Sequence, residues 1–249
     1  MSRLVNNIYA AYKNIGLFHY LKNNFTNEFG GKLQFGANCK IDHSKISGII
    51  AVGDNSIINN SVLSGNISLG KGCKIFHSEM FSKSSLEIGN YTSIWGPNIA
   101  LRQKIHPIKI GSFCSVARGV SFQEYNHNIE KITTYYIGQN IFNEKWDDES
   151  VSKGGIEIGS DVWIGANALI LGGAKVGNGC VIAGNAVVNK QYPDYSIIAG
   201  IPAKVIGYRF DDKSIEYLNE LKWWEWDIEK IKENKSLFMG KFVYHENIK

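Results

Sequence analysis

Residues 158–188 read IGSDVWIGANALILGGAKVGNGCVIAGNAVV and carry a strict repeat of six residues. One aliphatic residue begins every hexad, at Ile158, Ile164, Ile170, Val176, Ile182 and Val188. This period does not fit an amphipathic helix, whose apolar residues recur about every 3.6 positions. It fits short strands that meet at corners, with side chains stacked from coil to coil. The stretch therefore predicts a β-solenoid.

The same frame continues upstream. Ile110, Val116 and Phe122 begin hexads in register, since Phe122 precedes Ile158 by 36 residues. Residues 123–155 therefore form an insertion within one continuous repeat, and a loop of this length inside a compact solenoid is usually functional. Shorter runs in shifted frames indicate a less regular N-terminal half, and they begin at Val52 and Ile58, at Leu69 and Ile75, and at Ile88 and Ile94.

Two positions within the hexad have a distinct composition. The second is often glycine, which suits either a turn with unusual dihedral angles or a close approach between coils. The fifth position usually holds a small residue, and each of the four cysteines lies at the fifth position of its hexad: Cys39, Cys73, Cys114 and Cys180. Their spacing matches no zinc module, and cysteine packs readily as a small apolar side chain. We therefore expect buried core thiols rather than disulfides, metal ligands or nucleophiles.

The 249 residues have a globular composition, 44% hydrophobic and 20% charged. The net charge of +4 equals the excess within residues 1–40, which hold five basic residues and one acidic residue. Because a nucleic-acid-binding protein needs basic residues clustered through its fold, no nucleic-acid partner is expected. No apolar run approaches the ~18 residues of a membrane span, and no secretory signal is evident. The expected location is cytoplasmic.

Both ends of the chain are expected to be helical. Residues 3–25 place apolar side chains at helical spacing with lysines between them. This favours an amphipathic N-terminal helix, which either caps the solenoid or contacts the inner face of a membrane. After the repeat ends, Asp211 or Asp212 is the expected cap of a C-terminal helix. This segment holds three tryptophans, Trp223, Trp224 and Trp226. We expect them to pack against the core, and the alternative is that they stack on a sugar.

The insertion and the segments after it carry a resemblance to a known family. The insertion holds one histidine, His127, shortly after an in-frame hexad, and the repeat resumes through DVWIG at residues 161–165. The turn AGIPAKVI at 199–206 and the segment LKWWEWDIEKI at 221–231 extend the match. Together these residues resemble the hexapeptide-repeat acyltransferases, in the xenobiotic acetyltransferase branch and its relatives in polysaccharide gene clusters.

The resemblance implies an all-β solenoid, a left-handed parallel β-helix of hexapeptide repeats with an inserted catalytic loop. The expected organisation is an N-terminal helical cap at residues 1–30, a β-helix acyltransferase domain at 31–206 with the insertion at 123–155, and a C-terminal helical extension at 207–249. Members of this family usually form homotrimers with clefts between subunits, so a homotrimer is expected.

The resemblance also assigns roles to single residues. His127 would be the general base that takes a proton from an acceptor hydroxyl as it attacks the thioester of acetyl-CoA, a task suited to imidazole, whose ordinary pKa is ~6.5. Six positions match acetyl-CoA contacts: Trp163 and Ala166 beside the pantetheine arm, Gly184 further along, and Asn189, Lys190 and Lys204 near the nucleotide. Asn189 departs from the threonine common in the family. No metal is expected, because no His, Asp and Glu cluster has ligand spacing.

The leading hypothesis is therefore an acetyl-CoA-dependent O-acetyltransferase that modifies a sugar hydroxyl in capsular or surface polysaccharide assembly, by direct transfer. Alternatives within the enzyme class are acetylation of an antibiotic of the streptogramin or chloramphenicol type, and N-acetylation of an amino sugar. The same base and cofactor site would serve each. A noncatalytic β-solenoid scaffold is the alternative from another class. The expected partners are acetyl-CoA and a saccharide or other small-molecule acceptor.

Overall fold

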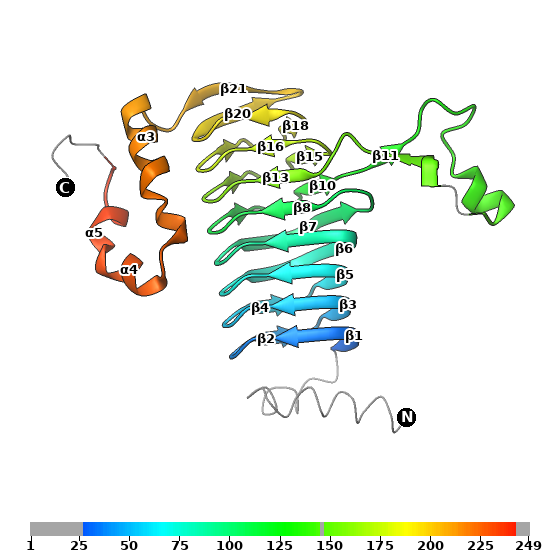
Figure 1. Ribbon diagram of the computed structural model, residues 1–249, viewed down its shortest axis with the longest axis horizontal. Helices are drawn as coiled ribbons and strands as arrows, with labels where there is room; N and C mark the ends of the chain where they lie inside the picture. The colour runs from blue at the N-terminus through cyan, green and yellow to red at the C-terminus, as the bar shows by residue number, and fades with distance from the viewer. Residues whose placement is uncertain (1–26, 145–146, 243–249) are drawn as a thin grey trace.

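A β-solenoid of about nine turns forms the centre of the computed structural model, which describes residues 27–144 and 147–242 (Figure 1). Each full turn contributes strands to three faces, and strands in successive turns pair in parallel. The N-terminal turns contain β1 (Glu28–Phe35), β2 (Lys40–Asp42), β3 (Lys45–Val52), β4 (Ile57–Asn59), β5 (Val62–Leu69), β6 (Lys74–Ile88) and β7 (Ser93–Gln103), of which the longer strands run over more than one face.

The later strands define the three faces. Face A holds β10 (Ser121–Gln123), β15 (Leu169–Leu171) and β18 (Val187–Val188). Face B holds β8 (Ile108–Ile110), β13 (Ile156–Ile158), β16 (Lys175–Val176) and β19 (Gln191–Tyr192). Face C holds β9 (Ser115–Val116), β14 (Trp163–Ile164), β17 (Val181–Ile182) and β20 (Ser196–Gly200). The last strand, β21 (Ala203–Tyr208), folds back antiparallel on β20 and covers the end of the solenoid.

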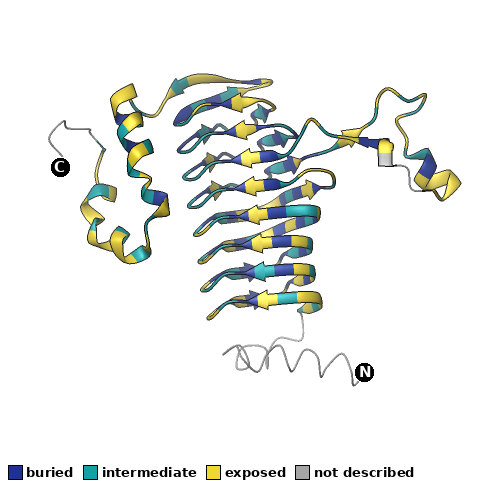
Figure 2. Cartoon of the chain, in the orientation of Figure 1, coloured by how far each residue is buried: buried dark blue, intermediate teal, exposed yellow. Residues whose placement is uncertain are grey.

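The core follows the six-residue frame. Each face contributes one vertical stack of aliphatic side chains, such as Ile110, Ile158 and Val176 on face B. All residues that begin hexads from Val52 to Val188 are at most 4% exposed. Figure 2 shows the resulting alternation of buried and exposed residues along the strands. Since full burial of one such side chain is worth about 1.5–3 kcal/mol, the stacks supply the main stabilisation of the prism.

The hexad glycines serve close approach between coils. A Cβ on Gly111 would lie 2.6 Å from the carbonyl carbon of Gly159 in the next turn. The positive φ angles occur two residues later, at Phe113 (59°) and Asp161 (58°). Of the two explanations for the glycines, close approach is confirmed, and the expectation of unusual dihedral angles at these positions is wrong.

The expectation of buried core cysteines is confirmed, because all four are free and at most 3% exposed. Their thiols donate to carbonyl oxygens, as Cys114 Sγ does to Gly159 O at 3.1 Å and Cys180 Sγ to Pro193 O at 3.0 Å. Burial raises the pKa of the Cys114 thiol to about 12. The protonated thiol is a poor nucleophile and metal ligand, so these side chains are packing elements.

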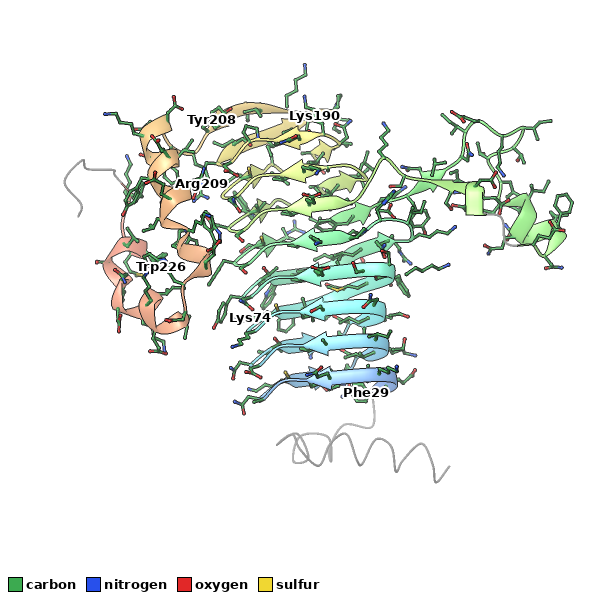
Figure 3. All side chains as sticks on the ribbon, viewed as in Figure 1. Phe29, Lys74, Lys190, Tyr208, Arg209 and Trp226 are labelled. Atoms are coloured by element: carbon green, nitrogen blue, oxygen red, sulfur yellow. The ribbon has the colours of Figure 1, made fainter. Side chains whose placement is uncertain are left out.

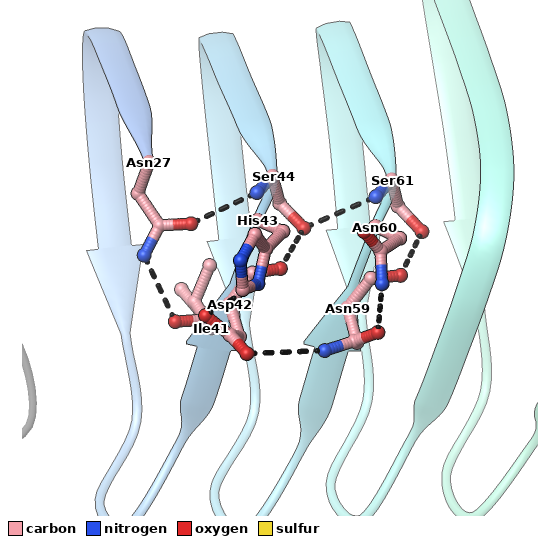
Figure 4. Close-up of polar contacts among 8 residues, drawn as sticks. All are labelled: Asn27, Ile41, Asp42, His43, Ser44, Asn59, Asn60 and Ser61. Atoms are coloured by element: carbon pink, nitrogen blue, oxygen red, sulfur yellow. Dashed lines mark hydrogen bonds and ion pairs between the residues drawn. The ribbon is translucent and has the colours of Figure 1, made fainter. Parts of the chain in front are cut away.

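Polar side chains satisfy the backbone at the corner between faces C and A (Figure 4). Ser44 Oγ donates to Asp42 O at 2.7 Å and accepts from Ser61 N at 3.1 Å. Asn27 starts this ladder by accepting from Ser44 N at 2.8 Å. The first strand, β1, begins at Glu28, three residues before the start expected for the β-helix domain. The N-terminal helix expected within residues 1–30 falls on 1–26, which lie outside the described residues.

The C-terminal segment packs against the corner between faces B and C. Asp211 caps α3 (Asp212–Leu221) by accepting from Ser214 N, as expected. The helix ends at Leu221, and its C-cap residue Lys222 adopts a left-handed conformation with φ 44°. A 3₁₀ turn (Trp223–Glu225), α4 (Ile228–Glu233) and α5 (Lys235–Phe238) follow.

The tryptophan cluster packs as expected. Trp224 is 8% exposed, and the ring of Trp223 lies 4.9 Å from that of Phe113 on the solenoid. Trp226 contacts Phe238, with ring centroids 6.5 Å apart. Within the described ranges, no helix is long and apolar enough to cross a membrane.

Candidate active site

The insertion leaves the solenoid after β10 at the corner between faces A and B, and returns at β13. It carries the short strands β11 (Asn126–His127) and β12 (Ser150–Val151), which pair antiparallel with His127 opposite Ser150. A π-helical turn (Gly138–Phe142) and a 3₁₀ turn (Asp147–Glu149) lie between them. The insertion projects from the side opposite α3, α4 and α5 (Figure 1).

A backbone carbonyl orients the imidazole of His127. Nδ1 lies 2.6 Å from the carbonyl oxygen of Thr134, and the ring packs on Tyr136 with centroids 4.3 Å apart. Because a carbonyl oxygen only accepts hydrogen bonds, Nδ1 must carry the hydrogen. The neutral ring therefore presents the lone pair of Nε2. The residue is exposed, so this nitrogen is accessible from solvent.

A hydrogen-bonded chain ties the loop to the solenoid beside His127. Tyr136 Oη lies 3.0 Å from Ser150 Oγ, and Lys104 Nζ donates to the same oxygen at 2.7 Å. Ser150 is 4% exposed, whereas Tyr136 and Lys104 are half-buried. The hydrogen-bonded chain fixes the tyrosine ring against which the imidazole packs.

Two buried carboxylates of the insertion accept hydrogen bonds from backbone N–H groups and not from the imidazole. Glu149 accepts from the backbone N–H of Gly138 at 2.7 Å and of Gln139 at 3.3 Å. Glu124, which is fully buried, accepts from the backbone N–H groups of Lys104 and Ile105 at 3.0 and 2.9 Å. Glu124 is therefore a structural residue, despite lying only three positions before the histidine. No sequence signal identified these partners, because the fold of the loop decides which carbonyl meets the ring.

A cavity of about 420 Å³ lies under the insertion, along the corner between faces A and B. The solenoid supplies its floor and flanks, and the insertion supplies its roof. Its lining residues are Ser64, Gly65, Phe81, Ser82, Lys83, Gln103 and Lys104 from the solenoid, and Tyr125, Tyr136 and Gln139 from the insertion. Tyr136 contacts both this cavity and the ring of His127.

Four of the six expected cofactor residues lie on or beside face C. Trp163 projects from β14 and is 56% exposed. Ala166 and Gly184 lie one above the other at the corner between faces C and A, where a Cβ on Gly184 would approach the Ala166 carbonyl oxygen to 3.1 Å. Lys204 on β21 pairs with Ala199 at the end of face C.

The other two expected cofactor residues lie elsewhere on the same chain. Asn189 and Lys190 follow β18 at the corner between faces A and B and are exposed. Figure 3 shows Lys190 at the end of the solenoid remote from Phe29. His127 shares the corner of these two residues, whereas Trp163 lies on face C. A single chain therefore does not bring His127 and all six expected cofactor residues together.

In the part of the chain that the structure describes, no group of three or more His, Cys, Asp or Glu side chains is arranged to hold a metal ion. The polar groups around His127 are instead a backbone carbonyl, hydroxyls and an ammonium group.

Comparisons with known proteins agree with this geometry. The model of the bacterial transferase hexapeptide family (six repeats) matches residues 155–190. A probable macrolide acetyltransferase of Lysinibacillus sphaericus is 44% identical over 133 residues, 50% of this chain and 73% of that protein. A chloramphenicol acetyltransferase of Morganella morganii is 36% identical over 149 residues, 57% of this chain and 71% of that protein.

The crystal structure of the polySia-specific acetyltransferase NeuO shares the fold. Its TM-score is 0.57 at 20% identity, over 90% of this chain and 94% of that one. This structural match covers a larger share of the chain than the two sequence relatives do. By its repeat, its loop and its relatives, the chain belongs to the hexapeptide-repeat acetyltransferases, in the xenobiotic acetyltransferase branch.

Proposed function

We propose that this acetyltransferase transfers the acetyl group of acetyl-CoA to a hydroxyl of a saccharide, with His127 as general base. The observation that carries the assignment is the hydrogen bond from His127 Nδ1 to Thr134 O, which leaves Nε2 free on an exposed loop. The family membership of the chain makes an enzyme the appropriate class, in place of a noncatalytic scaffold.

The transfer needs one proton to move twice. Nε2 of His127 takes the proton of the acceptor hydroxyl as its oxygen bonds to the thioester carbonyl carbon. The carbon–sulfur bond then breaks, and the imidazolium returns the proton to the leaving thiolate. The Thr134 carbonyl stabilises the imidazolium, because a hydrogen bond from a charged donor is stronger than one from a neutral donor. General base catalysis of this kind contributes roughly 10²–10⁴-fold to the rate.

The residues expected to hold acetyl-CoA fit its chemistry. Trp163 has an exposed ring that can contact the apolar parts of the pantetheine arm. At Gly184 the backbone lies close to the Ala166 carbonyl oxygen, and no side chain projects there. Lys190 and Lys204 are exposed, and among the described residues neither forms an ion pair. Their ammonium groups are therefore available to the phosphates of the nucleotide.

We place the complete site between subunits of a homotrimer of left-handed prisms. His127 and Trp163 lie on different sides of one chain, so a neighbouring chain must bring the missing half. The insertion exposes Ile132 (106%) and Phe142 (51%), and face C exposes Trp95 (55%) and Trp163 (56%). Apolar side chains gathered on a surface favour an interface.

Subunit mixing tests this arrangement. His127→Ala and Trp163→Ala chains, each inactive alone, are co-refolded. If sites are shared, mixed trimers regain activity because some clefts contain two intact halves. A monomer by light scattering, or no recovery in mixed trimers, would contradict the shared site.

The acceptor assignment rests on the cavity beside His127. Hydroxyl, amide and ammonium groups line it together with two tyrosines, which is the combination that sugars bind. A role in capsular or surface polysaccharide assembly is consistent with such an acceptor. The second candidate is acetylation of an antibiotic, favoured by the 44% and 36% identity to the macrolide and chloramphenicol acetyltransferases.

Thiol release from acetyl-CoA distinguishes the two candidates. The purified protein is assayed with saccharides, activated sugars, macrolides, streptogramins and chloramphenicol. Acceptor-dependent release with saccharides supports the proposal. Release with antibiotics alone replaces it with the second candidate.

A further inference from the structure

The cavity under the insertion has a rigid polar floor. Gln103, 3% exposed, accepts from Ser82 Oγ at 2.8 Å and from Ser84 N at 2.9 Å. Its amide nitrogen donates to His106 O at 2.7 Å. These bonds occupy the side-chain amide on both sides, so the floor keeps its shape without a ligand.

Two ammonium groups face this cavity, and no carboxylate is among its described lining residues. Lys83 is exposed, and Lys104 is held by one hydrogen bond to Ser150 and by the faces of Tyr125 and Tyr136, at 5.8 and 5.5 Å from the ring centroids. Among the described residues, neither lysine forms an ion pair. The cavity is therefore positively charged, with donor capacity left on both ammonium groups.

Three further lining residues of the cavity have polar groups that are free to bind a ligand. The side-chain amide of Gln139 and the hydroxyl of Tyr125 make no hydrogen bond within the described ranges. Ser64 Oγ accepts from Ser47 Oγ at 3.1 Å and keeps its own hydrogen to donate. Aromatic faces with free hydroxyl and amide groups match the alternating apolar and hydroxylated surfaces of a sugar ring.

The cavity also adjoins the base. Tyr136 lines it and packs on the His127 ring at 4.3 Å between centroids. The same tyrosine is linked through Ser150 to Lys104. A ligand held in this cavity would therefore contact the same tyrosine ring that packs on the imidazole.

From these contacts we propose that the cavity is an acceptor subsite for an anionic saccharide, whose carboxylate or phosphate is bound by Lys104 and Lys83. This inference rests on the proposed function and narrows its acceptor to sugars that carry a negative charge. Lys104 supplies the half-buried contact and Lys83 the solvent-exposed one.

Direct binding tests the charge requirement without acetyl-CoA. Isothermal titration uses a galacturonate trimer and its methyl ester as the carboxylate pair, and glucose 1-phosphate and glucose as the phosphate pair. At least one anionic probe is expected to bind about tenfold or more tightly than its neutral counterpart, since hydrogen bonds to charged groups are worth about 1.5–3 kcal/mol. The pair that shows the difference identifies the anion.

Four variants then locate the charge. Lys104→Met is expected to raise Kd for the anionic probe about tenfold, and Lys83→Met about threefold because its charge is more exposed to solvent. Lys104→Arg should retain most of the affinity. Lys32→Met, on the first turn and away from the cavity, is the matched control and leaves Kd unchanged. If loss of the Lys104 hydrogen bond to Ser150 unfolds the loop, Lys83→Met still tests whether binding depends on a positive charge.

The inference is overturned if the acid binds no more tightly than its ester and the phosphate no more tightly than the free sugar. It is also overturned if Kd is unchanged in both Lys104→Met and Lys83→Met. Acetyl transfer to neutral acceptors with no charge dependence would overturn it and leave the proposed function standing. Charge-dependent binding without any thiol release would support the subsite and contradict the proposed function.

Discussion

The carbonyl oxygen of Thr134 and Nδ1 of His127 lie 2.6 Å apart, seven residues along the chain. The acceptor that orients the His127 imidazole is therefore a backbone atom, whose place depends on the path of the loop and not on the side chain at position 134. Substitutions that change the path of the loop should therefore affect His127, whereas substitutions that change only the side chain at position 134 should not.

Thr134→Ala tests this distinction. The carbonyl remains, and the threonine side chain is exposed, so kcat should stay within about twofold of wild type because exposed substitutions of this kind are usually nearly neutral. Steady-state acetyl transfer with saturating acetyl-CoA is the measurement. A tenfold loss would show that the side chain, and not the carbonyl, serves the base.

Glu149→Ala, in contrast to Thr134→Ala, is expected to disturb the path of the loop and to lower kcat. It leaves the buried N–H of Gly138 without its acceptor, at a cost of about 1–3 kcal/mol, and loosens the segment that carries Tyr136. We expect kcat to fall about tenfold while the KM for acetyl-CoA is unchanged, since 1.4 kcal/mol corresponds to about tenfold. Glu130→Ala, at an exposed position of the same loop, is the control. Equal kcat in both variants would refute the positioning role of Glu149.

The glycine frame makes a prediction about stability. Gly111→Ala places a Cβ 2.6 Å from backbone atoms of the next turn and should lower the free energy of unfolding by about 1–3 kcal/mol. Gly207→Ala meets no atom within 4 Å and should change it by less than about 0.5 kcal/mol. Urea denaturation of both variants checks the difference. Comparable stabilities would mean that the coils do not pack as closely as described.

The buried thiols predict a loss of stability at alkaline pH. Burial raises the pKa of Cys73 from 9.0 to about 11 and that of Cys114 to about 12. Unfolded thiols ionise first, so the stabilising contribution is complete below pH ~9 and is lost as pH rises through the folded pKa values. The free energy of unfolding should therefore fall between about pH 9 and 11, less steeply in a Cys73→Ala, Cys114→Ala variant.

Thiol labelling gives an independent check at one pH. At pH 8 a disulfide reagent should label none of the four cysteines in the native protein and all four in denaturant, because only the thiolate reacts. Rapid labelling of the native protein would contradict the assignment of these side chains to the core.

Much of the fold follows from local sequence because the coils repeat the same contacts. The six-residue frame identifies core residues such as Ile158 and Ile164, and its interruption identifies the insertion. Lys222 shows the limit: its left-handed conformation ends α3, and the next residue, Trp223, packs on Phe113 of the solenoid. Propensity is a weak guide where tertiary contacts compete with it.

The site is less visible in the sequence. His127 stands out as the only histidine of the insertion, but its partner Thr134 contributes a backbone atom, which no residue pattern marks. Lys104 lies 23 residues before His127 and meets the loop only through the fold. The spacing of Trp163 and Lys190 likewise does not reveal that they lie on different sides of the prism.

One measurement tests the central claim most directly: acetyl transfer by wild type and His127→Gln under saturating acetyl-CoA, with acetyl-CoA affinity measured on the same samples. The glutamine keeps a polar side chain but cannot accept a proton at neutral pH. Our account predicts that kcat falls by roughly 10²–10⁴-fold while the affinity is retained. An unchanged kcat would contradict the assignment of His127 as the general base.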